Sequence, residues 1–147
     1  MSVGVRAAGV GDYGAVRDLL RAADLPLDGL SDTLDHFIVV EDGTGLVAAA
    51  GLEVYGRAAL LRSVVVAPSR RGAGLGGLLH DGTIAMAREL GVRDVYLLTE
   101  TAEKFFRRCG YAVVLRDDVP TAVRGSVEFT TVCPASAVVM HHATGLA

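Results

Sequence analysis

The chain has 147 residues, of which 51% are hydrophobic and 21% charged, and its formal net charge at pH 7 is −3. No apolar run approaches the roughly 20 residues that a membrane-spanning helix needs, and the slightly negative charge gives no general attraction to nucleic acid. The first six residues lack the basic segment, apolar core and cleavage site of a secretion signal. We therefore expect one domain over residues 1–147, located in the cytoplasm, with neither nucleic acid nor a membrane as a partner.

The two cysteines, Cys109 and Cys133, stand far apart in the sequence. Neither belongs to a CxxC pair, and no histidine lies at the spacing of a zinc ligand. The sequence therefore predicts two reduced thiols and no metal site.

The N-terminal part begins with a short strand and a helix. Val3–Ala7 fits the strand, and Asp12 is a plausible N-cap for the helix, which ends before Pro26. The apolar residues at helical spacing form the face that we expect to be buried: Val16, Leu19, Leu20 and Ala23. A second short helix is expected over Ser31–His36.

Strands separated by glycine turns follow this helical region. They span Phe37–Glu41, Leu46–Tyr55 and Ala58–Val66, with turns at Asp42–Gly45 and Gly56. Their β-branched residues and short turns are typical of an antiparallel meander.

The C-terminal half alternates helices and strands. A long helix is expected over Ala73–Leu90 with Gly91 as its stop, and its buried face comprises Leu75, Leu78, Leu79, Met86 and Leu90. The later elements are a strand at Asp94–Thr99, a helix at Ala102–Arg108, and strands at Tyr111–Arg116 and Ala137–His141, while Val119–Cys133 has no clear pattern. This order predicts a mixed α+β fold in which the long helix crosses over between two neighbouring strands.

An arginine-led, glycine-rich turn joins the third meander strand to the long helix. It reads Arg71-Gly72-Ala73-Gly74-Leu75-Gly76. Glycine lets the backbone approach an anion closely, and a helix N-terminus adds unsatisfied N–H donors and a favourable dipole. The turn therefore predicts a site for a phosphorylated cofactor.

A dinucleotide site is the alternative interpretation of the same turn. Gly72, Gly74 and Gly77 satisfy GxGxxG, and Glu100 follows where such a fold places its ribose-binding acid, about 20 residues further on. Against it, five residues including Pro68 separate the strand from the first glycine, where a dinucleotide turn needs the two nearly adjacent.

The turn and a later segment together resemble the GNAT family of N-acetyltransferases. The turn has the pattern RxxGxG, and it is preceded by Val64-Val65-Val66-Ala67-Pro68. This combination resembles the acetyl-CoA site of that family. The stretch from Ala102 to Tyr111, with Phe105-Phe106 in its middle, resembles the family's Ala-x-x-Phe-Tyr-x-x-x-Gly-Phe segment. The resemblance implies the GNAT fold, an α+β fold with a mixed, mostly antiparallel central sheet, a splayed strand pair and helices on both faces.

Finer features resemble a narrower branch, the arsenic-resistance N-acetyltransferases, which are similar to amino-acid acetyltransferases such as N-acetylglutamate synthases. These features lie at Gly51–Gly56, Leu60–Ser63, Leu97–Thr99 and Phe129–Met140. The resemblance implies an enzyme that moves acetyl from acetyl-CoA to the amine of a small metabolite, amino acid or amino-acid-like toxin by direct attack. The alternative is a weakly active or inactive module of the same fold that binds CoA. Paired subunits are frequent in similar enzymes, so a homodimer is a further expectation.

The resemblance also implies which residues hold the cofactor. Backbone N–H groups of the turn would hold the pyrophosphate, and the preceding strand would pair with the pantetheine. Arg108 either reaches a cofactor phosphate or is an exposed charge on its helix. Phe105 is expected in the core and Phe106 against the pantetheine or acetyl end. The complete set is Val64, Val65, Val66, Arg71, Gly72, Ala73, Gly74, Leu75, Gly76, Phe105, Phe106 and Arg108.

On the acceptor side, Glu53 is the candidate catalytic base. An ammonium group must lose a proton before it attacks, and Glu53 is a carboxylate in an otherwise apolar strand beside the one that carries the cofactor. The alternative is a solvated carboxylate on the polar face of this strand. Tyr55 shares its face and could orient the base or the substrate. By alternation Arg62 shares a face with Val64 and Val66, where it either clamps an acid group of the substrate or pairs with Glu53.

The sequence departs from the family where the departing thiolate would be protonated. Enzymes of the family often have a tyrosine as general acid at the position of Phe106, and phenylalanine cannot donate a proton. Water, Thr99 or Thr101 could substitute, and the sequence does not select among them. Thr99 is included among the predicted substrate-binding residues with Arg62 and Tyr55.

Overall fold

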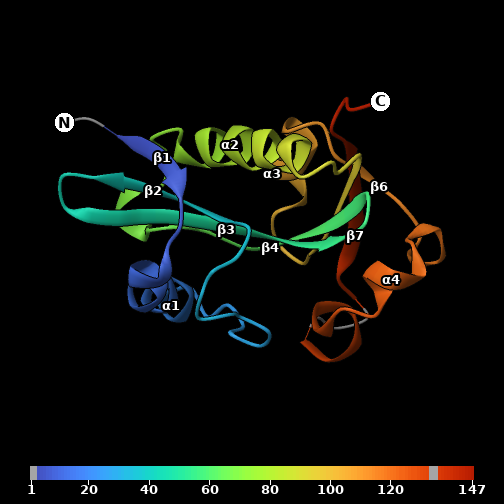
Figure 1. Ribbon diagram of the computed structural model, residues 1–147, viewed down its shortest axis with the longest axis horizontal. Helices are drawn as coiled ribbons and strands as arrows, with labels where there is room; N and C mark the ends of the chain where they lie inside the picture. The colour runs from blue at the N-terminus through green and yellow to red at the C-terminus, as the bar shows by residue number, and fades with distance from the viewer. Residues whose placement is uncertain (1–2, 133–135) are drawn as a thin grey trace. The chain divides into compact units, whose positions relative to one another are not determined.

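The computed structural model describes residues 3–132 and 136–147 (Figure 1). Its strands form a seven-stranded sheet in the order β1-β2-β3-β4-β5-β7-β6. The chain divides into two compact units, one comprising Met1–Leu52 and Ser63–Met86 and the other Glu53–Arg62 and Ala87–Ala147. A single domain over residues 1–147 stays a prediction.

The helices and strands follow the predicted α+β order. The strands are β1 (Gly4–Ala7), β2 (Phe37–Asp42), β3 (Gly45–Tyr55), β4 (Ala58–Val66), β5 (Asp94–Thr99), β6 (Ala112–Val113) and β7 (Val138–Ala143). The α-helices are α1 (Tyr13–Ala22), α2 (Leu75–Glu89), α3 (Glu103–Arg108) and α4 (Thr121–Arg124). None of the helices within the described residues combines the length and apolar character of a membrane span.

In the first unit, two helices cover opposite faces of the meander (Figure 1). Leu20 of α1 and Val39 of β2 belong to one buried cluster, together with Val16 and Phe37. On the other face, a Cβ atom added to Gly82 of α2 would lie only 3.0 Å from the side chain of Ile38. Since successive residues of a strand point to opposite faces, β2 contributes to both layers. The antiparallel pairing of β2 with β3 confirms the first hairpin of the predicted meander, and β4 follows β3 in the strand order.

In the second unit, β5 is the central strand. It pairs antiparallel with β7 along its full length and parallel with β4 through only three register pairs, from Ala58–Asp94 to Leu60–Tyr96. The strands β4 and β5 are parallel and joined through α2, as the predicted crossover requires. The short pairing agrees with the splayed strand pair that the fold implies. Leu60 and Tyr96 continue into a core cluster with Val119, Val123 and Val139.

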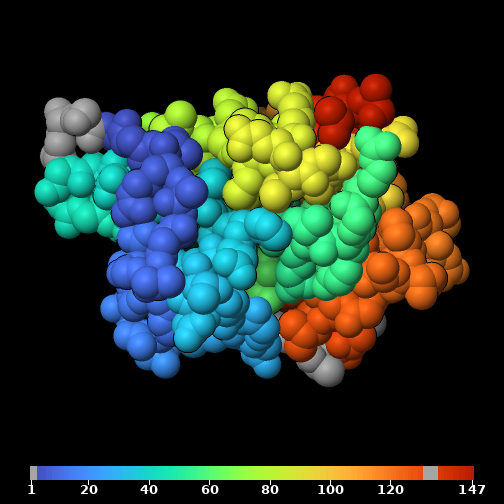
Figure 2. Space-filling model, viewed as in Figure 1, coloured from blue at the N-terminus to red at the C-terminus, as the bar shows by residue number. Residues whose placement is uncertain are grey.

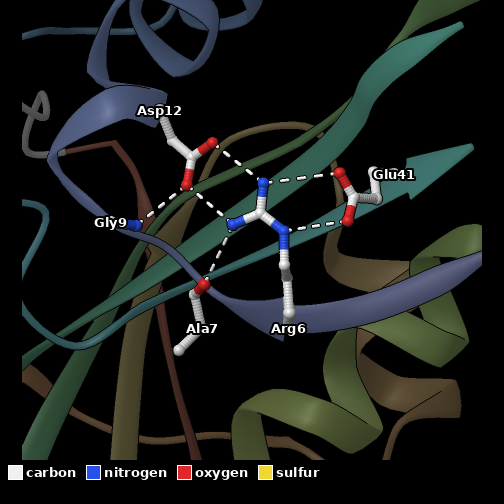
Figure 3. A network of polar contacts seen from close by, with 5 residues as sticks. All are labelled: Arg6, Ala7, Gly9, Asp12 and Glu41. Carbon is white, nitrogen blue, oxygen red and sulfur yellow. Dashed lines mark hydrogen bonds and ion pairs between the residues drawn. The ribbon is translucent and has the colours of Figure 1, made fainter.

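The start of α1 is held by an ion-pair network (Figure 3). Asp12 precedes α1 as predicted, but its side chain does not cap that helix. Instead its two oxygens accept hydrogen bonds from the Arg6 guanidinium at 2.8 and 2.9 Å, and Oδ2 also accepts from the Gly9 amide. Arg6 additionally donates to Glu41 on β2 at 2.9 Å. The network therefore ties β1 to β2 and to the segment before α1.

The helix predicted over Ser31–His36 is wrong, because these residues form turns. The Ser31 hydroxyl accepts a hydrogen bond from the Thr33 amide at 3.2 Å, and such local bonds compete with helix formation. Leu34 and His36 adopt left-handed backbone conformations, with φ of 52° and 60°. Apolar residues of this loop nevertheless pack against the α1 cluster, and the loop lies beside α1 in Figure 2.

The long helix begins two residues later than predicted and ends before Gly91, whose φ of 78° confirms the expected stop. Leu75 and Leu79 are buried as predicted, whereas Leu78 is 41% exposed, so its predicted burial is wrong. The buried face instead continues through residues about one helical turn apart, at Thr83 and Ala87. The Thr83 hydroxyl is satisfied by donating to the Leu79 carbonyl at 2.9 Å.

In the C-terminal segment, short helical elements separate the strands β6 and β7. The strand predicted over Tyr111–Arg116 is reduced to β6, and the one predicted over Ala137–His141 is β7. A short 3-10 helix at Arg116–Asp118 precedes the stretch that has no clear sequence pattern, and that stretch contains helix α4 and a π-helical segment at Glu128–Val132. Cys133, with its predicted reduced thiol, lies outside the described residues.

Candidate functional site

The glycine turn of the first unit has the open backbone that an anion site requires. Gly72 and Gly74 are exposed and adopt left-handed conformations, with φ of 84° and 79°. Apart from the adjacent residues of the chain, no described residue has an atom within 4 Å of where a Cβ would stand at either glycine. Helix α2 begins at the next residue, Leu75, so its first N–H groups lie at this turn. The turn therefore fits the pyrophosphate that the sequence predicts for it.

Arg70 anchors the turn from within the same unit. Its guanidinium contacts the Asp42 carboxylate at 2.8 Å and donates to the Thr44 hydroxyl at 3.3 Å, which ties the turn to the β2–β3 hairpin. Hydrogen bonds from the Thr44 side chain and backbone, and then Arg70, lower the pKa of Asp42. The neighbouring Arg71 is exposed. Since Arg70 is held by the hairpin, Arg71 is the arginine of this turn that is better placed to meet a ligand.

The end of β4 departs from regular strand geometry at Ser63, whose φ is 58°. This left-handed residue interrupts the alternation of faces, so the predicted shared face of Arg62 with Val64 and Val66 does not follow. Val65 is buried in the cluster that contains Val16 and Leu20 of α1, whereas Val64 and Val66 are half-buried.

Glu53, in the second unit, is the centre of a side-chain network. Its Oε1 accepts hydrogen bonds from the Tyr55 hydroxyl at 2.6 Å and the Ser126 hydroxyl at 2.5 Å, and its Oε2 accepts one from Arg62 at 2.8 Å. Glu53 retains 22% of its side-chain exposure. Three donors therefore hold the carboxylate of a side chain that is still partly exposed.

Arg62 meets two carboxylates. Its side chain is 2% exposed, and its Nε lies 3.4 Å from Oε1 of Glu128, in addition to the contact with Glu53. Two roles were predicted for Arg62, a clamp for the substrate and a partner of Glu53, and the structure shows the pairing with Glu53. Since the Arg62 side chain is buried against these two carboxylates, the clamp role of Arg62 is not the resting arrangement.

The surroundings of Glu53 act on its pKa in opposite directions. Burial alone would raise the pKa of this carboxyl group, but hydrogen bonds from Ser126, Tyr55 and Arg62, together with the charge of Arg62, lower it below its ordinary value. Burial and the bond to Glu53 raise the pKa of Tyr55. At neutral pH the pair therefore consists of an ionised carboxylate and a hydroxyl that donates to it.

Thr99 lies at the end of β5, before α3. Its hydroxyl oxygen accepts a hydrogen bond from the Ala102 amide at 3.0 Å and so fixes the residues that lead into the helix. This bond does not use the hydroxyl proton, which Thr99 can still donate.

The two rings of α3 have the reverse of the expected burial. Phe106 is the buried ring and Phe105 is half-buried. The prediction that Phe105 lies in the core is therefore wrong, because Phe106 is the ring that lies there. Phe106 makes edge-to-face contacts with Phe105 and Tyr111, at ring distances of 5.1 and 5.5 Å. Arg108, at the last position of α3, is exposed. A contact of these residues with a cofactor stays a prediction.

Sequence reasoning missed Ser126 and Glu128. Both are buried, and both belong to the stretch for which the sequence has no clear pattern. The available signal was the arginine in β4, because a buried guanidinium needs carboxylate partners. That signal could not choose Glu128, since the chain has 17 acidic residues. Among the described residues, no three His, Cys, Asp or Glu side chains are grouped to hold a metal ion.

A scan of protein families matches residues 33–113 to the acetyltransferase (GNAT) domain. No curated protein sequence matches the chain. The matched range contains β2 to β6 and therefore the glycine turn, Glu53 and α3.

Solved structures of N-acetyltransferases have the same fold. N-acetylglutamate synthase from Neisseria gonorrhoeae, complexed with CoA and N-acetylglutamate, is 19% identical with a TM-score of 0.82, over 98% of this chain and 35% of that chain. Rv2747 from Mycobacterium tuberculosis, in complex with CoA and a second ligand, is 23% identical with a TM-score of 0.80, over 95% and 98% of the two chains. The ribosomal-protein-S18-alanine N-acetyltransferase from Escherichia coli is 17% identical with a TM-score of 0.73, over 99% and 96%.

The chain spans about a third of the length of the N-acetylglutamate synthase chains that it matches. At these identities the likeness shows the fold. The GNAT fold, with its mixed sheet, excludes the doubly wound dinucleotide fold that GxGxxG offered as an alternative.

Proposed function

The chain belongs to the GNAT acetyltransferase family, whose domain uses acetyl-CoA, and we propose that it transfers acetyl to the amine of a small amino acid or amino-acid-like compound. The observation that carries the proposal is the exposed, left-handed backbone of Gly72 and Gly74 at the start of α2, within the range that matches the family. Glu53, in the same range, is the carboxylate on which the acceptor side of the proposal depends.

On the donor side, bound acetyl-CoA supplies an acetyl thioester. We assign the pyrophosphate to the N–H groups of the turn, a phosphate to Arg71 or Arg108, and the pantetheine to the backbone at Val64–Val66. The full set of proposed cofactor contacts is Val64, Val65, Val66, Arg71, Gly72, Ala73, Gly74, Leu75, Gly76, Phe105, Phe106 and Arg108.

On the acceptor side, Glu53 meets the ammonium group of the substrate. Arg62, Glu53 and Glu128 together carry one positive and two negative charges, and this excess of negative charge favours a cationic group nearby. The acceptor ammonium loses one proton to Glu53 directly or through water, and its nitrogen then forms the new N–C bond as the C–S bond of the thioester breaks. The nitrogen releases a second proton to water, which leaves a neutral amide. Tyr55 and Thr99 are the remaining proposed substrate contacts.

The chain supplies no tyrosine where family members often have their general acid. The buried Phe106 cannot donate a proton, but a thiol with a pKa of about 8.5 is a tolerable leaving group as the thiolate. The Thr99 hydroxyl or water then supplies the proton. The same observation favours a second candidate function, a module that binds CoA with little turnover.

The acceptor class rests on resemblance. The likeness to the arsenic-resistance branch favours an amino-acid-like compound, arsenical or not, and the structure of a synthase complexed with N-acetylglutamate favours an amino acid. A panel of acceptors therefore needs amino acids, arsenic-bearing amino acids and simple alkyl amines.

Thermal shifts with acetyl-CoA, CoA and NAD, followed by thiol release from acetyl-CoA across this panel, test the proposal. Stabilisation by acetyl-CoA and CoA, with turnover of an amino-acid-like acceptor, is the expected result. Binding of CoA without turnover across the panel would indicate the module. Stabilisation by NAD alone would contradict both.

A further inference from the structure

The hydroxyl of Ser126 is fixed between two partners. Its Oγ accepts a hydrogen bond from the Glu128 amide at 3.2 Å and lies 2.5 Å from Oε1 of Glu53, to which it donates. Ser126 is 4% exposed. Because the oxygen already accepts from Glu128, the hydroxyl proton points to the carboxylate.

The backbone around Ser126 holds it in place. Its amide donates to the Val123 carbonyl at 3.0 Å, and its carbonyl accepts from the Phe129 and Thr130 amides, both at 3.0 Å. The Thr130 hydroxyl donates to the same carbonyl at 3.1 Å. Ser126 is therefore a fixed donor, although it stands 73 residues from Glu53 in the sequence.

The donors around Glu53 leave little of its hydrogen-bonding capacity unused. An ionised carboxylate has about four acceptor positions. Ser126 and Tyr55 occupy Oε1, and Arg62 occupies Oε2. Among residues 3–132 and 136–147, this arrangement leaves about one position, on the partly exposed side chain, for a ligand N–H or a water molecule.

We propose that Ser126 is a positioning residue for acetyl transfer: its hydroxyl orients the Glu53 carboxylate so that the remaining acceptor position receives an N–H of the acceptor ammonium. The inference rests on the proposed function, in which Glu53 meets the acceptor. Ser126 itself touches neither acetyl-CoA nor the acceptor in this role.

Loss of the Ser126 hydroxyl has a defined electrostatic consequence. Burial raises the pKa of Glu53, and the bond from Ser126 is the strongest influence that lowers it, followed by those from Tyr55 and Arg62. The charged and titratable groups around the carboxylate are Arg62, Tyr55 and, through Arg62, Glu128. Removing the Ser126 donor leaves burial less opposed, so the pKa of Glu53 rises.

The test is a carboxyl-carbon NMR titration of Glu53 in the full chain, with acetyl-transfer kinetics as a function of pH. Ser126→Ala is expected to raise the Glu53 pKa, move the acid limb of kcat/KM to higher pH and lower kcat about tenfold, with KM for acetyl-CoA unchanged. Ser126→Thr, which keeps the hydroxyl, is expected to restore the wild-type titration. Thr130→Ala is the matched control, because its hydroxyl bonds the same segment but not Glu53.

An unchanged Glu53 titration in a folded Ser126→Ala protein would overturn the proposal, as would an equal shift in Thr130→Ala. If Ser126→Ala does not fold, Ser126→Cys takes its place, since a thiol is a weak donor and a shift in the same direction is expected. The titration does not depend on turnover. If the protein shows no acetyl transfer but Ser126→Ala still raises the pKa of Glu53, the proposed function is rejected. The role of the Ser126 hydroxyl in holding the Glu53 carboxylate is then retained.

Discussion

The turn over residues 71–76 and the network around Glu53 differ in what they are made of. The turn uses backbone groups of consecutive residues, and its main requirement is glycine at two left-handed positions. The network uses side chains from β3, β4 and the segment after α4, up to 75 residues apart. A local backbone site depends on a short stretch of sequence, whereas a side-chain network depends on the fold of its whole unit. Substitutions can separate these two kinds of dependence.

The largest expected effect is on the stability of the network. Arg62→Met leaves Glu53 and Glu128 without their cation, and breaking a buried ion pair in this way typically costs about 3–5 kcal/mol of unfolding free energy. Arg107→Met is the control, because its exposed pair with Glu103 within α3 is worth only about 0.5 kcal/mol or less. Denaturant unfolding of both variants measures the difference. Equal losses of unfolding free energy would show that the buried ion pairs of Arg62 stabilise the fold no more than the exposed pair of Arg107 does.

The next effect is on catalysis without a large loss of fold. Glu53→Gln keeps the shape of the side chain and removes its charge, so we expect turnover at neutral pH to fall about 100-fold or more. CoA binding, measured by calorimetry, is expected to stay at the wild-type level because the turn is unaltered. Turnover that is unchanged across pH would place the base at another residue.

The turn is tested by a smaller change in binding. Gly74→Val adds a side chain at a φ of 79° and blocks the approach of a phosphate, so we expect CoA affinity to fall about tenfold or more. Gly77→Ala is the control: Gly77 lies in α2 with open space around it, and alanine there favours the helix. Calorimetric titration with CoA, alongside thermal melts, measures both. Wild-type affinity in Gly74→Val would count against the turn as the phosphate site.

The smallest effect concerns the more exposed ion pairs of the first unit, which contrast with the buried pairs around Arg62. The hydrogen bonds from Arg6 and then from the Gly9 amide lower the pKa of Asp12 from 3.8 to about 2. A lowered folded-state pKa contributes stability above pH 3.8, and this contribution is lost as the pH falls toward about 2. Asp12→Asn should therefore reduce the unfolding free energy at pH 7 by about 1 kcal/mol or less, with the difference narrowing at acid pH. An equal difference at pH 7 and pH 2.5 would contradict this linkage.

The regular part of the fold was predictable from local patterns. The strands β2, β3 and β4, the helix α1 and the stop at Gly91 follow from apolar periodicity and glycine, which act over a few residues. The loop at Ser31–His36 was not predictable in the same way, because side-chain bonds to the backbone outcompete the helix there. The buried face of α2 was only partly predictable, because packing against the sheet decides which of its leucines are covered: Leu75 and Leu79 are buried and Leu78 is exposed.

The sequence by itself determined the family and predicted the donor site, because both depend on consecutive residues: the arginine and glycines of the turn and the paired phenylalanines of α3. Only the tertiary structure decided the partners of Glu53. Ser126 and Glu128 reach this carboxylate and Arg62 through the folding of a segment without regular periodicity. A buried charge requires partners but does not specify where in the chain they come from, so their identity emerges only when the chain is folded.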